Sequence, residues 1–137
     1  MDKKYEILEH KADLKIKVFG KTKKELFLNM MIAMSENMKP EIKKPNDYSK
    51  KEVKIKSVDL TSLLVDFLSE VLYLSQTNKE AYFEININKL TETELEGELI
   101  GRKAARFNED IKAVTYHELD IYQREDGLWE ATVLFDI

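Results

Sequence analysis

Carboxylates near both ends of this 137-residue chain are the side chains with the most specific chemistry. Glu9 and Asp13 stand just before an alternating run, and Asp136 is followed by Ile137 and its terminal carboxylate. Two anions held at one place require a cation, a basic partner or extensive hydration. Oxygen donors of this kind suit hard cations such as Ca²⁺ or Mg²⁺ rather than zinc or copper. If the two ends meet, they predict a metal site; otherwise these groups are ordinary surface acids.

Two other pairs of titratable residues are weaker candidates for a functional site. His10 and His117 belong to different predicted elements and could converge in space, but a hydrogen-bonded histidine without catalytic duty is the commoner case. Asp66 and Glu70 are one helical turn apart, a spacing that could share a metal ion. A solvated pair of carboxylates is the favoured interpretation, because helices carry such pairs routinely.

No motif of a known enzyme class is present. The chain has no cysteine, which excludes disulfides, thiolate catalysis and cysteine-ligated zinc. Its four glycines form neither of the glycine-rich phosphate-binding patterns, and no serine lies in a G-x-S-x-G elbow. The residues taken alone therefore indicate no catalytic motif.

Composition indicates a soluble globular protein, which we expect to form one domain over residues 1–137. The net charge of −4, from 22 basic and 26 acidic residues, gives no support for nucleic acid as the primary ligand, although a local basic patch remains open. The first residues lack the apolar core of a signal peptide, and no apolar run approaches the ~20 residues of a membrane helix. We expect a cytoplasmic protein that does not contact membranes.

Two helices are predicted. Thr22 and Glu25 form a capping-box pattern before the first helix, and Asp59 is a good N-cap for a second that runs to about residue 75 or 77. Methionines at helical spacing in the first helix could form a soft binding groove, but core filling is favoured. These methionines are Met30, Met31, Met34 and Met38.

The remaining elements are predicted strands. Asp126-Gly127 between two β-type runs is a strong hairpin signal, since a primed turn needs the positive φ that glycine adopts freely. Residues 39–48, with both prolines, and the basic residues 102–108 are predicted loops. The predicted strands are residues 5–8, 14–20, 51–57, 82–90, 94–101, 111–122 and 128–137. The result is an α+β fold, with two helices packed on a largely antiparallel sheet.

Several stretches together resemble the archease family. They are residues 8–13 (LEHKAD), 18–22 (VFGKT), 63–73 (LLVDFLSEVLY), 111–117 (IKAVTYH) and the ending at 136–137 (DI). They occur in the family's order and at its typical length, so the similarity spans essentially the whole chain. The string at 111–117 and the Asp-Ile ending are the most specific parts.

The resemblance implies a helper of an enzyme. Archeases assist the RtcB-type RNA ligase, which joins tRNA halves after intron removal, by promoting guanylylation of the ligase's histidine and so multiple turnover. Family members bind a divalent ion, usually assigned as calcium, through residues that correspond here to Asp13, Asp136 and the terminal carboxylate of Ile137. The resemblance thus implies a calcium-binding activator in tRNA splicing, without direct sequence-specific binding of nucleic acid.

Two positions depart from the family pattern. Lys11 stands where the family usually has threonine, beside the proposed ligand Asp13, and either points outward or competes electrostatically with the ion. Around Ala105 the chain lacks a histidine that is common in the family, so no role of that histidine is carried over. Neither change alters the pair of Asp13 and Asp136.

The mechanism that we expect is presentation of an acidic, metal-holding tip to the ligase, where the ion offsets charge on the GTP phosphates during nucleotidyl transfer. His10, Lys112, His117 and Glu118 are further candidates for shaping this tip. The alternative is a chaperone-like binding module in which the carboxylates are incidental. A metal-dependent hydrolase ranks last, because no base–nucleophile pair is visible.

Overall fold

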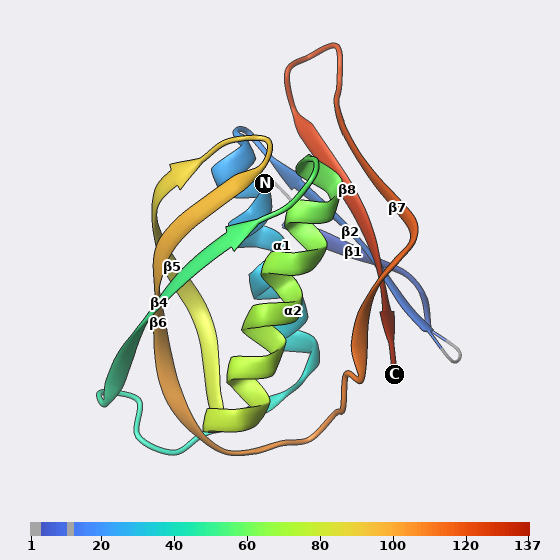
Figure 1. Cartoon of the computed structure of the whole chain (residues 1–137). Helices are drawn as coiled ribbons and strands as arrows, with labels where there is room; N and C mark the ends of the chain where they lie inside the picture. The colour runs from blue at the N-terminus through green and yellow to red at the C-terminus, as the bar shows by residue number, and fades with distance from the viewer. Residues whose placement is uncertain (1–3, 11–12) are drawn as a thin grey trace.

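The computed structural model describes residues 4–10 and 13–137 and has two helices and eight strands in these ranges (Figure 1). The helices are α1 (Lys23–Asn37) and α2 (Leu60–Asn78). The strands are β1 (Tyr5–His10), β2 (Asp13–Gly20), β3 (Pro40–Ile42), β4 (Tyr48–Lys56), β5 (Glu80–Leu90), β6 (Glu94–Phe107), β7 (Ala113–Gln123) and β8 (Trp129–Asp136).

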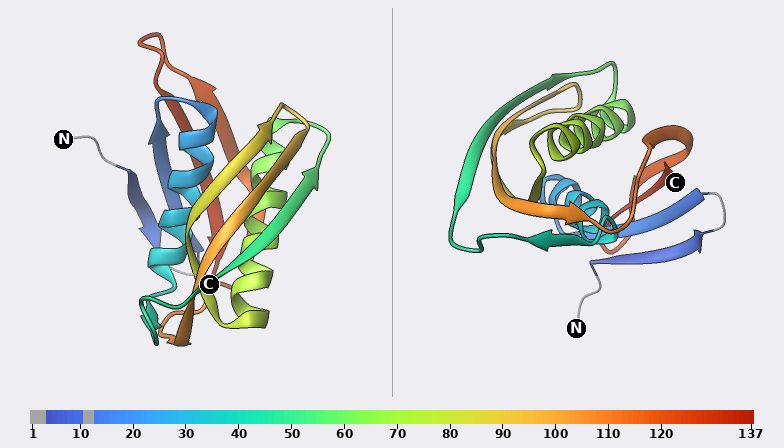
Figure 2. Two further views of the ribbon diagram at one scale, coloured as in Figure 1. Left: turned by 90° about the vertical axis from the view of Figure 1, so that its left-hand side faces the viewer. Right: turned by 90° about the horizontal axis from the view of Figure 1, so that it is seen from below.

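The strands form two antiparallel sheets. One has the order β1-β2-β8-β7, and in the other the long strand β6 pairs with β3, β4 and β5. Figure 2 shows both helices in the space between the sheets, with the β4–β6–β5 strands curving around α2. The predicted α+β class with two helices and antiparallel strands is confirmed, and the strands are divided between two sheets.

Both helices begin at the predicted caps. The Thr22 hydroxyl accepts from the Glu25 N–H at 3.1 Å, and the Asp59 carboxylate accepts from the Ser62 N–H at 2.8 Å. Each bond satisfies one of the free N–H groups of a first turn. Helix α2 ends where Lys79 adopts the left-handed conformation, with φ 52°. Within the described residues, no helix is long and apolar enough to cross a membrane.

The core lies between the helices and the two sheets. Phe27 of α1 and Phe67 of α2 meet there with ring centroids 5.9 Å apart, and both are fully buried. The four methionines of α1 and its C-cap are also buried, so they fill the core and the binding-groove alternative is wrong. They provide flexible apolar volume where α1 packs between strands of both sheets.

Both predicted loops contain strand. Residues 40–42 form β3, and β6 continues through residues 102–107 to pair with it, so the predictions of loops at 39–48 and 102–108 are wrong there. Pro40 is tolerated because it begins a short edge strand, where one side of the backbone needs no ladder partner. The charged side chains of this part of β6 are tolerated because Lys103 and Arg106 are exposed and Arg102 is only half-buried.

Strand β7 contains a large bulge. Thr115 pairs with Leu134 and Asp120 with Thr132, so residues 116–119 stand opposite the single residue Val133. Glu118, inside the bulge, has a φ of 56°, in the left-handed region. A bulge of this kind re-aims side chains and bends the strand. It lies just beyond the part of β7 that adjoins the end of β8.

Candidate metal centre

Asp13 and Asp136 are direct cross-strand partners. They face each other at the ends of β2 and β8, and both are exposed. Their neighbours Leu14 and Phe135 form the next pair and are buried, so the two aspartates project from the opposite face of the sheet, away from the core. Opposed residues of an antiparallel pair have Cβ atoms about 4.5–5.5 Å apart on the same face. The structure therefore brings the two predicted ligands together.

This pairing is electrostatically unfavourable on its own. Like charges directly opposite each other destabilise a sheet. Among the described residues, neither aspartate has an ion-pair partner. The nearest lysine along β2, Lys15, instead contacts Glu118 at 3.1 Å. A cation between the aspartates would offset this repulsion.

The end of the chain is fixed beside Asp136. The side chain of Ile137 is half-buried and packs against the core, and the Lys112 N–H donates to the Asp136 carbonyl at 2.7 Å. Ile137 also borders a cavity of about 320 Å³ whose lining includes Ile7, Leu14, Asn37, Lys39, Glu109, Asp110 and Ile111. Figure 1 shows the C-terminus directly after β8, so the terminal carboxylate belongs to the residue that follows Asp136.

The bulge of β7 brings a third carboxylate to the same sheet face. Glu118 reaches across β8 to Lys15, whose hydrogen bond and charge hold the pKa of the Glu118 carboxyl below its usual range. The positive character of His117 acts on the pKa of that carboxyl in the same direction. The His117 N–H donates to the Thr115 hydroxyl at 3.3 Å, which supports the turn of the bulge. Glu118 is therefore paired with Lys15, which stands two residues after Asp13 on the same face of β2.

The N-terminal candidates are only partly placed. The backbone of His10 pairs with Leu14 in the β1–β2 ladder, next to the aspartate pair. The side chains of Glu9 and His10, and all of residues 11 and 12, lie outside the described residues. The predicted convergence of the two histidines and the effect of Lys11 therefore also fall outside them.

The donor set at the strand ends fits a hard cation. In the described part of the chain, no group of three or more His, Cys, Asp or Glu side chains could hold a metal. The candidate site has fewer side-chain donors: Asp13 and Asp136, with the terminal carboxylate of Ile137 as the third oxygen group. These are oxygen donors only, and Ca²⁺ takes six to eight oxygens, with water completing an exposed site. The donors present thus suit Ca²⁺ with part of its coordination left open.

Of the helical pair Asp66 and Glu70, Asp66 accepts hydrogen bonds from two other segments. The Asp66 carboxylate accepts hydrogen bonds from the hydroxyls of Ser57 and Tyr116, so it joins the end of β4 to the bulge of β7. The bond from Tyr116 raises the pKa of that tyrosine. Asp66 is therefore a structural acceptor, a role that its helical spacing did not predict.

The sequence contained an overlooked signal for the bulge. Val114 is buried on the inner face of β7, but the next apolar residues that pack on the core are Leu119 and Ile121, which have the opposite parity. A strand that keeps one face inward cannot change parity without an irregularity. This shift could have located the bulge, and with it the position of Glu118 over Lys15.

Comparison with known proteins gives matches over nearly the whole chain. The model of the Archease protein family matches residues 5–137. The chain is 40% identical to protein archease of Methanosarcina barkeri, over 98% of this chain and 97% of that one, and 30% identical to protein archease of Pyrococcus abyssi, over 98% and 99%.

Two solved structures share the fold. The solution structure of Methanobacterium thermoautotrophicum protein 1598 superposes with a TM-score of 0.71 at 26% identity, covering 98% of this chain and 99% of that one. A crystal structure described as an archease, possible chaperone, from Thermotoga maritima also gives 0.71, at 21% identity and 96% coverage of both chains. The second shows similarity of fold alone.

Proposed function

Since the chain belongs to the archease family, we propose that it is a non-catalytic activator of an RtcB-type RNA ligase in tRNA splicing. It promotes guanylylation of the ligase and allows multiple turnover. It holds a divalent ion, calcium by preference, through Asp13, Asp136 and the terminal carboxylate of Ile137. The ligase is its protein partner.

The register of β2 against β8 is the observation that carries this proposal. It places Asp13 and Asp136 opposite each other, although they stand near opposite ends of the sequence. The β2–β8 ladder is regular for eight consecutive pairs up to this point, so the opposition is a fixed property of the sheet. Repulsion between the two carboxylates is a cost that binding of a cation removes.

The surrounding residues orient the site. Lys112 fixes the backbone of Asp136 through its N–H, and Ile137 anchors the end of the chain in the core. Glu118 neutralises Lys15, which otherwise would compete with the ion for the aspartates. When bound, the ion supplies positive charge that offsets phosphate charge in nucleotidyl transfer. The exposed position of the aspartates leaves the ion accessible to the ligase.

The test is an assay with the cognate ligase present in limiting amount. Guanylylated ligase and ligated RNA per ligase molecule are measured with and without this protein, across Ca²⁺, Mg²⁺ and Mn²⁺. Asp13→Ala is expected to abolish turnovers beyond the first while the circular dichroism spectrum stays unchanged. Calorimetric titration of the variant with Ca²⁺ is expected to show loss of binding.

Asp120→Asn is the matched control. Asp120 is exposed on β7 of the same sheet, so the variant loses one negative charge away from the strand ends. It is expected to support full turnover and to bind Ca²⁺ normally. Full turnover with Asp13→Ala would contradict the metal role, and the absence of any effect of the wild-type protein on the ligase would contradict the activator role.

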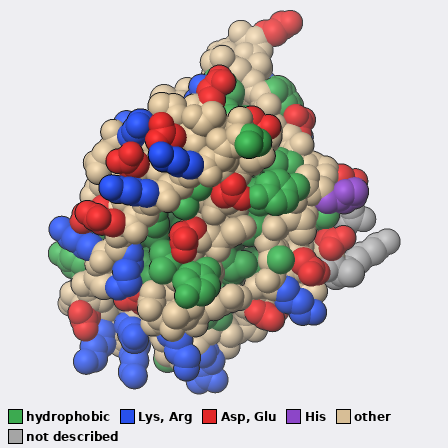
Figure 3. Space-filling model, viewed as in Figure 1, with side chains coloured by type: hydrophobic (Ala, Val, Ile, Leu, Met, Phe, Trp, Pro, Cys, Tyr) green, Lys and Arg blue, Asp and Glu red, His purple; other side chains and the backbone are tan. Residues whose placement is uncertain are grey.

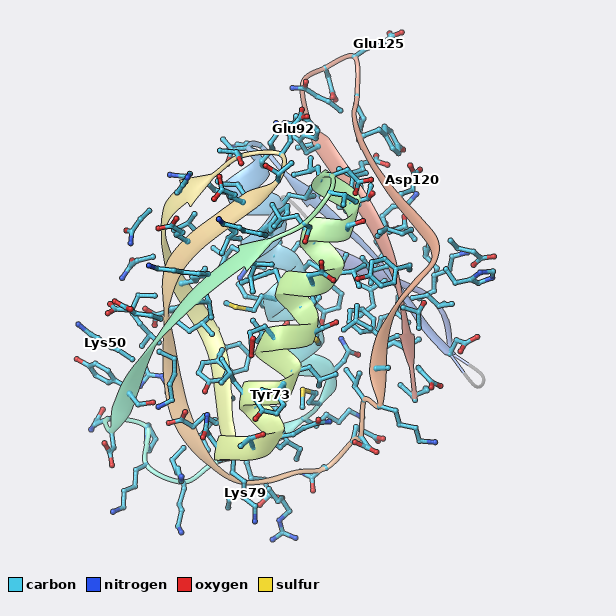
Figure 4. All side chains as sticks on the ribbon, in the orientation of Figure 1. Lys50, Tyr73, Lys79, Glu92, Asp120 and Glu125 are labelled. Carbon is cyan, nitrogen blue, oxygen red and sulfur yellow. The ribbon has the colours of Figure 1, made fainter. Side chains whose placement is uncertain are left out.

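A client-binding role, as in a chaperone, is the second candidate. Tyr73 on α2 and Tyr116 on β7 are 60% and 58% exposed, and a shallow hollow separates these elements. Figure 3 shows hydrophobic side chains at the surface on this face, and Figure 4 places Tyr73 on the open side of α2. If the protein is a chaperone of this kind, the wild type and Asp136→Asn are expected to suppress the aggregation of unfolded clients equally well.

A further inference from the structure

Lysines gather at the end of the molecule where α2 finishes. Figure 3 shows Lys and Arg side chains along this lower margin, and Figure 4 places Lys79 there. The four residues that define the lysine surface are all exposed: Lys43, Lys44, Lys79 and Lys103. They come from three separate segments, so the cluster is a product of the fold and cannot be read as a charge run.

Backbone hydrogen bonds fix these segments against one another. The Lys43 N–H donates to the Lys103 carbonyl at 2.8 Å, and the Ala104 N–H donates to the Lys79 carbonyl at 2.8 Å. The Lys103 Nζ also donates to the carbonyl of Asn78 at 3.0 Å. The four amines are therefore carried on a rigid junction between β3, β6 and the end of α2.

Within the described residues, no lysine of this surface forms an ion pair. The buried Glu80 accepts from the hydroxyls of Ser49 and Tyr82 and lies 3.8 Å from Lys51. It is also the cross-strand partner of Lys103, whose charge, after the two hydrogen bonds, helps to lower the pKa of the Glu80 carboxyl, so Glu80 offsets part of the charge of Lys103. Asp47, whose N–H donates to the Lys44 carbonyl, is an exposed acid in the adjoining turn. It offsets one of the four charges at most.

The negative end of helix α2 explains part of the cluster. Lys103 donates to a carbonyl of its last turn, and Lys79 follows its last residue. A helix C-terminus is equivalent to roughly half a negative charge, which is far less than four lysines. Within the described residues, Lys103 is the lysine of this surface whose amine bonds to the end of α2. Lys43 and Lys44 are exposed and belong to a different segment, the one after β3. The charge of Lys43 and Lys44 is surplus to the needs of the fold.

An exposed aromatic ring adjoins the lysine surface. Tyr48 is 58% exposed and pairs in register with Arg102, whose guanidinium carbon lies 5.7 Å from the ring centroid. Arg102 also donates to the carbonyl of Pro45, in the turn after Lys44. Amines without an ion-pair partner beside an accessible ring are the combination that single-stranded nucleic acids use, with phosphates on the amines and a base stacked on the ring.

We propose that the lysine surface and Tyr48 bind single-stranded nucleic acid without sequence preference. The four amines contact consecutive phosphates, and the Tyr48 ring stacks on a base. A polyanionic peptide such as poly-glutamate offers the charges but no ring to stack on Tyr48, whereas every base of a nucleic acid has a face that can stack. This proposal goes beyond activation of the ligase and does not depend on it, because the surface and the metal centre are made by different strands.

The experiment uses the full chain and a fluorescent RNA of about 20 nucleotides without secondary structure, with binding followed by anisotropy between roughly 50 and 200 mM salt. Lys43→Gln with Lys44→Gln removes two phosphate contacts. The slope of log K against log salt is expected to fall in magnitude by about 1.4, since each contact to a single strand contributes roughly 0.7. The matched control is Lys54→Gln with Lys56→Gln, two exposed lysines at the other end of β4, which is expected to leave the slope unchanged.

Stacking is tested separately. Tyr48→Ala is expected to weaken binding about fivefold or more, and Tyr48→Phe to retain it, because the ring and not the hydroxyl contacts the base. A duplex of the same sequence is expected to bind less tightly than the single strand. Three results would each overturn the proposal. The first is failure of the protein to bind RNA at the lowest salt, and the second is an equal loss of RNA affinity in the two double lysine variants. The third is that poly-glutamate of equal charge displaces the RNA as readily as unlabelled RNA does.

Discussion

At the scale of single residues, Asp13 and Asp136 carry a conflict between stability and ion binding. Each is exposed, and each opposes the other across the β2–β8 ladder. A neutral side chain at either position removes the repulsion and should stabilise the metal-free protein. Retention of two charges at such a pair is understandable if an ion occupies the site for much of the protein's working life.

Asp136→Asn should therefore separate the two effects. Without calcium, the variant is expected to be as stable as the wild type or more stable, with a free energy of unfolding higher by on the order of 0.5 kcal/mol. Its unfolding temperature should therefore be equal to that of the wild type or higher. With calcium well above its dissociation constant, only the wild type should gain stability, because a ligand that binds only the folded state shifts unfolding by mass action. Calorimetric melts with and without calcium measure both. An equal gain in the variant would show that the ion binds elsewhere.

The ion pair of Glu118 with Lys15 should depend on pH. Its pKa is lowered in the folded protein by Lys15, so the interaction is fully present above the ordinary pKa of glutamate and is lost as pH falls through the lower folded pKa. Titration by NMR should show the Glu118 carboxyl ionising below its usual range, and Lys15→Met should move it back upward. Lys54→Met, remote from the bulge, should leave it unchanged. An unshifted Glu118 in the wild type would mean that the contact with Lys15 is not formed in solution.

At the scale of elements, the bulge of β7 depends on helix α2. Asp66 in the middle of α2 accepts from Tyr116 in the bulge and from Ser57 after β4. One carboxylate thus connects the outer strand of one sheet with the outer strand of the other. The bulge in turn holds Glu118 over Lys15, so α2 contributes indirectly to the setting of the aspartate pair.

Asp66→Ala should loosen this connection. We expect a loss of about 1 kcal/mol of unfolding free energy, since the hydrogen bonds are partly exposed and their hydroxyl partners can turn to water. Asp66→Asn should lower the pKa of Tyr116, which is raised in the wild type chiefly by its bond to Asp66, and ultraviolet titration measures this. Glu70→Ala, one turn along α2, serves as the control. A Tyr116 titration that is unaffected by Asp66→Asn would contradict the proposed bond.

At the scale of the whole molecule, the sequence predicted what local patterns specify. Both helices, their caps and the β7–β8 hairpin follow from residues close in sequence, and the structure confirms them. Strand β3 was missed because three residues starting with Pro40 carry no local strand signal and pair only through β6. The opposition of Asp13 and Asp136 was likewise beyond sequence patterns, because register between distant strands is set by the core.

The fixed end of the chain makes a whole-molecule prediction about tags. A peptide fused after Ile137 converts the terminal carboxylate into an uncharged amide and must leave from a residue that packs against the core. Calcium affinity is expected to fall, with little change in the fold, while the same peptide fused before Met1 should leave affinity unaltered. Titration calorimetry compares the two fusions. Equal affinities would remove the terminal carboxylate from the ligand set and leave Asp13 and Asp136 in it.

Strand β8 lies between β2 and β7, and this position sets the order of events during synthesis. Asp13 emerges from the ribosome long before Asp136, so a growing chain that has not yet reached β8 carries one aspartate of the pair without the other. The pair forms when β8 inserts and brings together residues that are distant in the sequence, and the entropic cost of such a closure grows only slowly with the length of chain between them. The proposed ion site therefore exists only in molecules in which β8 has inserted between β2 and β7, so ion binding reports on the closure of this sheet.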